Sequence, residues 1–274
     1  MTDMATSVLI GSARPWAEIV RIAQAVDEAG AYAVYVPDHF MPNTEDDAIV
    51  DGPRLEAWTL LSALSQQTSS CRLGVLVLGA GYRHPAVVAN MVAALDHVSG
   101  GRAIAGLGAG WQVNEHAAYG IDLLSDRDRS DRFEESVHVV ASLLREGRTT
   151  FEGRYFSLHD APNQPAPVQD RLPVLVAGKG ERRTLRTAAK YADAWHTWGT
   201  PESFAAKSAV LDQRCEEAGR DPGTIRRATG FFVQDLSDGA ATVAPFGDVC
   251  DEFVFGDTGH EADLLVDAVV TAIG

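Results

Sequence analysis

Cysteine is scarce in this 274-residue chain, which contains only Cys71, Cys215 and Cys250. Three separated cysteines without a CxxC pair exclude a disulfide-rich scaffold and a zinc ribbon, and they suit a reducing compartment. The N-terminal residues Met1–Met4 lack the basic region and apolar core of a signal peptide. No apolar run approaches the ~20 residues that span a bilayer. The sequence therefore predicts a cytoplasmic protein without a membrane partner.

Positive charge is also in short supply, with 23 Lys and Arg against 38 Asp and Glu and a net charge of −15. Nucleic-acid affinity depends on cations that neutralise phosphates, so a nucleic-acid partner is not expected. A small anion can still bind at a local basic patch, because salt screens the remaining charges over about 8 Å. The histidines show no metal-ligand spacing and no HExxH or EF-hand motif occurs, so no metal site is predicted.

Short apolar segments alternate with longer segments of helical periodicity. The predicted strands are Ser7–Ile10, Ala33–Pro37, Arg72–Leu78, Ala103–Leu107, Val174–Ala177, Ala194–Trp198, Ala228–Val233 and Glu252–Phe255. The predicted helices are Pro15–Ala29, Arg54–Gln67, Pro85 to Ser99, Asp131–Arg145, Glu181–Ala192, Pro201–Ala218 and Glu261–Ile273, and a loop is expected around Asp160–Asp170.

Strands that are apolar on both faces and alternate with helices indicate a parallel sheet, closed here as a (β/α)8 TIM barrel. An open, doubly wound α/β sheet is the alternative. Only residues 234–251 separate the last two strands, so the seventh helix is expected to be very short or absent. We expect one domain over residues 1–274, with an insertion around 111–172.

Catalytic residues of such barrels follow the carboxyl ends of the strands. Asp38 and His39 follow the second predicted strand. An imidazole titrates near neutrality, and an adjacent carboxylate can orient it, so His39 is the candidate proton donor or acceptor. The alternative is a histidine in a surface loop. His84 and His116 could also line the mouth of the barrel.

Two glycine-rich segments follow the fourth and fifth strands. Gly108-Ala109-Gly110 would let the backbone approach a flat ligand, with Trp111 as a wall; the alternative is simply a tight turn. The dinucleotide fingerprint is excluded, because Trp111 replaces its last glycine.

The second segment, Ala177-Gly178-Lys179-Gly180, precedes a helix with cations at Arg182, Arg183, Arg186 and Lys190. Glycines at a helix start beside cations predict a phosphate cradle. The alternative is a solvated outer face of the barrel.

These features resemble the luciferase-like monooxygenase superfamily, and within it the branch that uses the deazaflavin coenzyme F420. The matching segments are Tyr35–Phe40, Tyr82–Ala89, Leu95–Arg102, Gly106–Trp111, Glu115–His116, Ala118–Gly120, Phe151–Gly153, Pro173–Glu181, Thr184–Arg186 and Ala188–Ala192. The uncharacterised mycobacterial-type members are the most similar over Phe151–Thr229. Sugar-phosphate dehydrogenases of this branch carry a glutamate where this chain has Trp111, so that substrate is not assigned.

The resemblance implies a barrel that holds F420 across the strand ends and transfers a hydride to or from a small organic substrate. It implies a non-proline cis peptide near Leu76-Val77 beneath the ring, and His39, oriented by Asp38, beside the reactive carbon. Trp111 would shape the substrate side, and Arg182 or Arg183 would attract the acidic tail of F420. The implied cofactor-binding residues are Asp38, Leu76, Val77, Gly108, Ala109, Gly110, Ala177, Gly178, Lys179, Gly180 and Arg183. A homodimer is also implied. The alternatives are an FMN-dependent monooxygenase of the same fold and a non-catalytic cofactor-binding protein.

Overall fold

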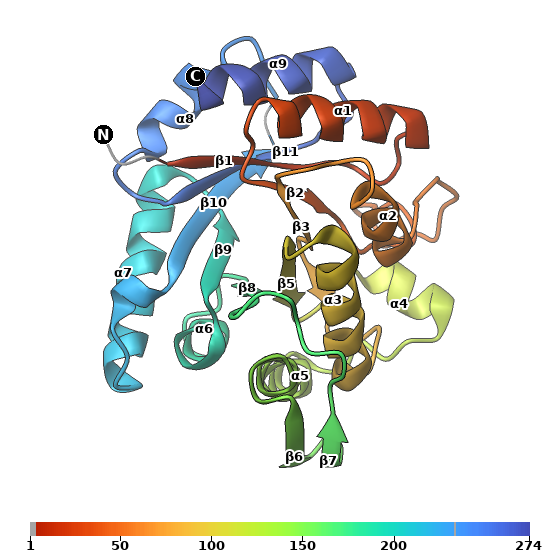
Figure 1. Ribbon diagram of the computed structural model, residues 1–274, viewed down its shortest axis with the longest axis vertical. Coiled ribbons are helices and arrows are strands. Elements are labelled where there is room, and N and C mark those ends of the chain that lie inside the picture. Colours follow the sequence, from red (N-terminus) through yellow and green to blue (C-terminus); the bar gives the residue numbers. More distant parts are fainter. Residues whose placement is uncertain (1–3, 233) are drawn as a thin grey trace.

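The computed structural model describes residues 4–232 and 234–274, and its centre is a closed ring of eight parallel strands (Figure 1). The ring is closed because β3 pairs with β5 on one side and β1 pairs with β11 on the other. The strands in ring order are β1 (Ala5–Leu9), β2 (Ala33–Val36), β3 (Arg72–Val75), β5 (Ala103–Gly108), β8 (Val174–Ala177), β9 (Ala194–Trp198), β10 (Arg226–Phe232) and β11 (Glu252–Gly256). The predicted (β/α)8 barrel is confirmed, and the open-sheet alternative is wrong.

Alternate residues of the strands enter two separate apolar clusters. Val8 and Val34 face outward and pack beneath the helices, whereas Leu9 and Tyr35 belong to a smaller cluster inside the ring. Both faces of each strand are therefore buried, which explains why the amino-acid sequence of each strand is apolar nearly throughout. The interior cluster fills the barrel and leaves the strand ends free for a site.

Helices cover the outside of the ring (Figure 1). They are α1 (Trp16–Glu28), α2 (Ala57–Leu64), α3 (Pro85–Ser99), α5 (Asp126–Glu146), α6 (Thr184–Tyr191), α7 (Pro201–Glu217) and α9 (Ala262–Ile273). Between β10 and β11 the described residues 234–251 form the short α8 (Gly239–Val243) and a 3-10 turn at Ala244–Phe246. The expectation of a very short seventh helix is confirmed. No helix in the described part of the chain is long and apolar enough to cross a membrane.

The segment between β5 and β8 differs most from the sequence prediction. It adds α4 (Val113–Tyr119) and an antiparallel hairpin of β6 (Arg148–Glu152) and β7 (Ser157–Pro162), which projects away from the barrel (Figure 1). The hairpin overlaps the loop expected around Asp160. It was not predicted because its residues are largely exposed and polar, and therefore lack the apolar alternation of a half-buried strand.

Several helix boundaries differ from the prediction because capping groups fix them. α5 begins at Asp126 instead of Asp131, because the Ser125 hydroxyl accepts a hydrogen bond from the Asp128 N–H at 3.2 Å. α2 begins at Ala57 instead of Arg54, because the Glu56 side chain caps the Thr59 N–H at 2.8 Å.

Two further elements, one strand and one helix, also differ from their predicted bounds. The first strand spans Ala5–Leu9 instead of Ser7–Ile10, and the fifth helix begins at Thr184 instead of Glu181. The seventh predicted strand ends at Val233, which lies outside the described residues, as do Met1–Asp3 of the N-terminus.

The third predicted strand is interrupted. β3 ends at Val75, a cis peptide joins Leu76 to Val77, and the chain resumes as β4 (Leu78–Gly79) beside β5. The cis peptide expected from the family resemblance is therefore confirmed at that position.

Candidate active site

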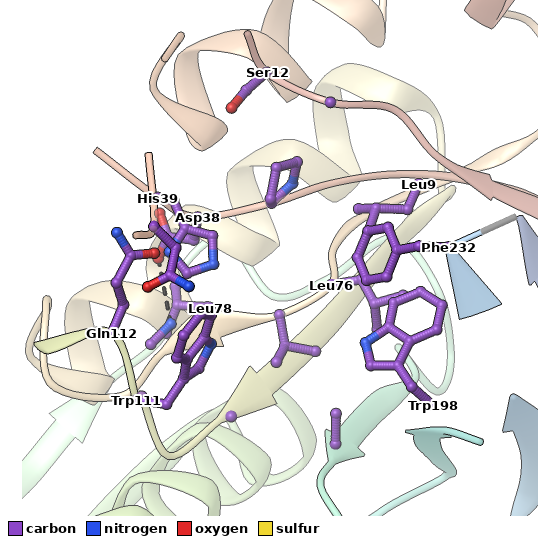
Figure 2. A pocket seen from close by; sticks show the side chains of 18 of the residues that line it. Leu9, Ser12, Asp38, His39, Leu76, Leu78, Trp111, Gln112, Trp198 and Phe232 are labelled. Atoms are coloured by element: carbon purple, nitrogen blue, oxygen red, sulfur yellow. Dashed lines mark hydrogen bonds between the residues drawn. The ribbon is translucent and has the colours of Figure 1, made fainter. Parts of the chain in front are cut away.

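A cavity of about 850 Å³ opens at the carboxyl ends of the barrel strands. Residues at the ends of all eight strands, or in the connections that follow them, line it, and its volume lies in the range of small-molecule sites. Figure 2 shows His39, Asp38 and Trp111 gathered on one side, with Leu76, Trp198 and Phe232 on the other. The cavity is thus placed where the barrel fold predicts a site.

Most of the predicted site residues line this cavity. They are Asp38, His39, Leu76, Val77, Gly108, Ala109, Gly110, Ala177 and Gly178. Trp111 also lines it and remains 56% exposed. Lys179, Gly180 and Arg183 lie in the turn just beyond Gly178 and do not line the cavity.

His39 is held by Glu115 of α4, and the expected orientation by Asp38 is wrong. The Nδ1 atom of His39 lies 2.8 Å from Oε1 of Glu115, which is completely buried. Tyr82 donates its hydroxyl to the same oxygen, and the Phe40 N–H donates to Oε2 at 2.8 Å. The Trp111 ring meets the imidazole edge-on, with 5.5 Å between the ring centroids. The buried carboxylate of Glu115 therefore fixes the orientation of the His39 imidazole through its Nδ1 atom.

Asp38 has different partners, which explains the correction. Its carboxylate accepts two hydrogen bonds from Arg83, at 2.8 and 3.1 Å, and one from the Gly79 N–H at 3.3 Å. Burial raises the pKa of Asp38, and the Arg83 guanidinium offsets only part of that rise. Asp38 thus ties the β2 connection to the start of α3 and leaves His39 to Glu115.

The protonation of Glu115 decides the chemistry available to His39. Burial alone would raise the pKa of Glu115, but hydrogen bonds from His39, Tyr82 and the Phe40 N–H outweigh it and lower the pKa below its ordinary value. An ionised carboxylate only accepts hydrogen bonds, so Nδ1 of His39 must carry a proton. In a neutral ring, Nε2 is then the acceptor available to a ligand.

The turn after β8 places an open helix terminus at the cavity. Gly178 has φ +133°, and a Cβ there would lie 3.1 Å from Cγ2 of Thr184, the first residue of α6. In the described part of the chain no side chain caps the start of α6, and both Gly178 and Thr184 line the cavity. Uncapped N–H groups at a helix start attract anions, so this turn fits the phosphate of a cofactor.

The cations around this turn are less available than their number suggests. Arg183 pairs with Asp131 at 2.6 Å, while Arg186 and Lys190 pair with Glu134 at 2.9 and 2.8 Å. These pairs join α6 to α5, so three cations of the basic cluster are engaged by two carboxylates and one net positive charge remains. Lys179 and Arg182 form no ion pair with any described residue.

The two glycines within β5 leave room for the backbone bulge at the Leu76-Val77 cis peptide. A Cβ on Gly106 would lie 2.0 Å from the carbonyl oxygen of Val75, and one on Gly108 would lie 2.5 Å from a methyl carbon of Val77. The bulge thus occupies the space that side chains at these two positions would need. Gly108 was predicted to let a ligand approach, and its close neighbour in the structure is Val77.

The two other candidate histidines do not line the cavity. His84 caps α3 by accepting from the Ala86 N–H at 3.2 Å, and Nδ1 of His116 lies 2.8 Å from the Gln112 carbonyl. His196, which the sequence predicts to be a surface or packing residue, does line it from the middle of β9. Burial lowers the pKa of His196 to about 3, so its ring is neutral.

Arg14 and Asp257 were missed as well. They pair across the connections that follow β1 and β11, at 2.6 Å, and both line the cavity. Asp257 follows directly after β11 and stands two residues after the predicted end of that strand at Phe255. The rule that catalytic residues follow the carboxyl ends of barrel strands, which identified His39, would therefore also have identified Asp257.

A closed parallel barrel with a site at its strand ends defines the structural class, and comparison with known proteins gives the family. The family model of luciferase-like monooxygenases matches residues 2–260. The chain belongs to this family, as the sequence resemblance implied.

The similar curated proteins differ in chemistry. An F420-dependent hydroxymycolic acid dehydrogenase of Mycobacterium tuberculosis is 32% identical over 82% of this chain and 61% of its own length. A pyrimidine monooxygenase, RutA, of Cronobacter sakazakii is 35% identical over 68% of this chain and 56% of its own. The chain thus spans about three fifths of the length of these relatives.

Solved structures show the same fold at lower identity. A structure of an F420-dependent secondary alcohol dehydrogenase in complex with an F420-acetone adduct superimposes with a TM-score of 0.82, at 20% identity and 98% coverage of both chains. The monooxygenase RslO1 from Streptomyces bottropensis gives 0.76 at 16% identity, again over 98% of both chains.

Proposed function

We propose that the protein is an F420-dependent oxidoreductase that transfers a hydride between the deazaflavin and a small organic substrate. The observation that carries the proposal is the arrangement of the cavity, with an imidazole held by a buried carboxylate on one side and an uncapped helix terminus on another. The relatives named as F420-dependent dehydrogenases support it.

Each part of the cavity has a role in this proposal. Bound F420 would supply the hydride chemistry, and the protein supplies position and a proton. Gly178 and the start of α6 hold the phosphate, with Lys179 and Gly180 in the same turn. The bulge at Leu76-Val77 and the segment Gly108–Gly110, with Ala177, support the ring. Trp111 shapes the substrate side.

His39 is the proton donor or acceptor in the proposal. Glu115 and Tyr82 fix the ring in one orientation, and the ionised carboxylate stabilises the positive charge that the imidazole gains when it takes a proton. Arg183 is already paired with Asp131, so of the two arginines proposed to attract the acidic tail of F420, Arg182 is the better placed.

An FMN-dependent monooxygenase is the second candidate, since FMN also presents a phosphate and the pyrimidine monooxygenase relative is 35% identical. The pairing of Arg186 and Lys190 with Glu134 removes part of the charge argument for F420. The third alternative, a non-catalytic cofactor-binding protein, would be favoured by a barrel left open at its shortened C-terminal region, but the ring is closed.

Titration of the purified protein with F420 and with FMN, followed by fluorescence, tests the proposal. Saturable F420 binding and reoxidation of the reduced complex by an oxidised acceptor would support it, whereas binding of FMN alone, with oxygen uptake, would refute it.

His39→Ala should lower turnover by about 10²- to 10⁴-fold and leave the Kd for the cofactor unchanged. Unchanged turnover would remove His39 from the mechanism. The homodimer stays a prediction that sedimentation analysis can test.

A further inference from the structure

Almost all charged side chains that line the cavity are neutralised within the protein. Arg14 and Asp257 form a two-bond ion pair at 2.6 and 2.7 Å, and Asp38 is paired with Arg83 at 2.8 Å. Arg54 is different. In residues 4–232 and 234–274 it is the cavity-lining cation that has no carboxylate oxygen within 4 Å.

The hydrogen bonds of Arg54 are also incomplete. Its one hydrogen bond to a described residue is donated by Nη1 to the carbonyl of the neighbouring Pro53, at 2.8 Å. A guanidinium carries five N–H donors and does not lose its proton in a protein. Burial lowers the pKa of Arg54, and the negative charge of Glu115 acts in the opposite direction. Glu115 is already occupied by its own three donors. The cavity therefore contains a partly desolvated cation with N–H donors that no described residue accepts.

A second unsatisfied group lies beside this arginine. Ser12 is 1% exposed and lines the cavity, and its hydroxyl has no hydrogen-bond partner among the residues that the structure describes. The Leu55 N–H donates to the Ser12 carbonyl at 2.9 Å, which joins the segment carrying Arg54 to the connection after β1. Figure 2 shows Ser12 among the residues that line the cavity, and its hydroxyl oxygen is itself buried, so a ligand reaches it only if the side chain turns toward the cavity. A buried hydroxyl without a partner is costly unless a ligand satisfies it.

The position of these groups separates them from the proposed phosphate turn. Ser12 and Arg54 belong to the connections that follow β1 and β2, as does His39. In the ring, β2 lies opposite β9, with three strands between them on either side, and the phosphate turn follows β8, the neighbour of β9. An anion held by Arg54 would thus lie on the His39 side of the cavity, where the substrate is expected.

We infer that Arg54 and the Ser12 hydroxyl bind the carboxylate of a small organic acid, which makes an acid the substrate class of this site. A planar guanidinium matches a carboxylate through two parallel hydrogen bonds, and one cation balances one negative charge. The role of the acid as a substrate rests on the proposed function, whereas the carboxylate site itself does not.

Ligand-detected NMR titrations of the cofactor-free protein with butyrate and butyramide, and with phenylacetate and phenylacetamide, test the inference. Each pair shares a carbon skeleton and differs in charge. A charge-assisted hydrogen bond predicts that each acid binds about 10- to 100-fold more tightly than its amide. Arg54→Gln should abolish that preference, Arg54→Lys should keep part of it, and Ser12→Ala should weaken it by a smaller factor.

Arg21→Gln is the matched control. Arg21 lies on α1 and pairs with Asp263 on the outer surface, so this variant changes net charge equally and should leave the preference intact. Thermal unfolding verifies that the Arg54 variants are folded. Equal binding of acid and amide by the wild type, no saturable binding of either, or a preference that survives Arg54→Gln would each overturn the inference. Because no cofactor is present, failure of F420 to bind would refute the proposed function and leave this result standing.

Discussion

Replacing Glu115 by glutamine is expected to reverse the tautomer of His39 without unfolding the protein. In the wild type the carboxylate accepts three hydrogen bonds, two at Oε1 from His39 and Tyr82 and one at Oε2 from the Phe40 N–H. Glutamine has one oxygen, which the Phe40 N–H requires because a backbone amide can only donate. Its NH₂ group then faces the other two partners, and both can become acceptors. The proton of the imidazole must move to Nε2.

The size of the effect follows from this count of donors. All partners in Glu115→Gln find a hydrogen bond, so the free energy of unfolding should change by about 1 kcal/mol or less. Glu115→Ala leaves three donors unpaired in a buried site, at about 1–3 kcal/mol each, so it should cost roughly 3 kcal/mol or more. With Nε2 protonated, a neutral His39 cannot accept a proton from a ligand, so turnover that depends on it should fall by about 10²- to 10⁴-fold.

Long-range ¹H–¹⁵N NMR of labelled protein reads the tautomer directly, with His39→Ala used to assign the signals. The wild type should show a protonated Nδ1, and Glu115→Gln a protonated Nε2. A glutamine variant that keeps the Nδ1 proton, or that is as unstable as Glu115→Ala, would show that the hydrogen-bond argument is wrong.

Three further predictions concern other parts of the site and its supports. Asp27 accepts four hydrogen bonds from residues 69–71, and its pKa falls from 3.8 to about 2. Because a lowered acid pKa stabilises the fold only above the ordinary value, Asp27→Asn should cost about 2 kcal/mol at neutral pH, and denaturant titrations should show this difference vanishing as the pH falls from 4 to 2. Gly178→Ala should weaken cofactor binding, seen as a higher Kd, because φ +133° and the contact with Thr184 disfavour a side chain; an unchanged Kd would remove this turn from the cofactor site. Arg83→Met should cost about 3 kcal/mol, since it leaves the Asp38 carboxylate buried and unpaired, and a double variant with Asp38→Asn should recover part of that loss in thermal melts.

The barrel itself could be predicted from the sequence because its signals are local. A strand such as Val174–Ala177 is apolar throughout and bounded by turn residues, so its limits were predicted to the residue. Helix starts were predicted less well, because capping by Ser125 or Glu56 depends on which of several polar residues turns toward the backbone. The exposed hairpin of β6 and β7 carries no such signal.

The candidate site could be predicted only where the relevant residue follows a strand. His39 was found in this way, but its partner Glu115 lies 76 residues further along the chain and is brought to it by α4. The cations of α6 illustrate the opposite error. Their spacing suggested a free basic surface, whereas Glu134 of α5, which lies 56 and 52 residues away in the sequence, pairs with two of them. Pairings over such distances depend on tertiary packing, which composition and periodicity do not encode.

The hydrogen bonding of β1 with β11 gives the barrel a seam at which the beginning and the end of the fold meet. Five residue pairs close this seam, and α1 packs against α9 above it. Loss of either strand would leave two unpaired edges in place of a ring, each of them a template for another chain. The strand at each end of the fold therefore depends on the other for its hydrogen-bond partner. Removal of β1 or β11 would open the barrel, and with it the cavity, even if every residue that contacts His39 were kept.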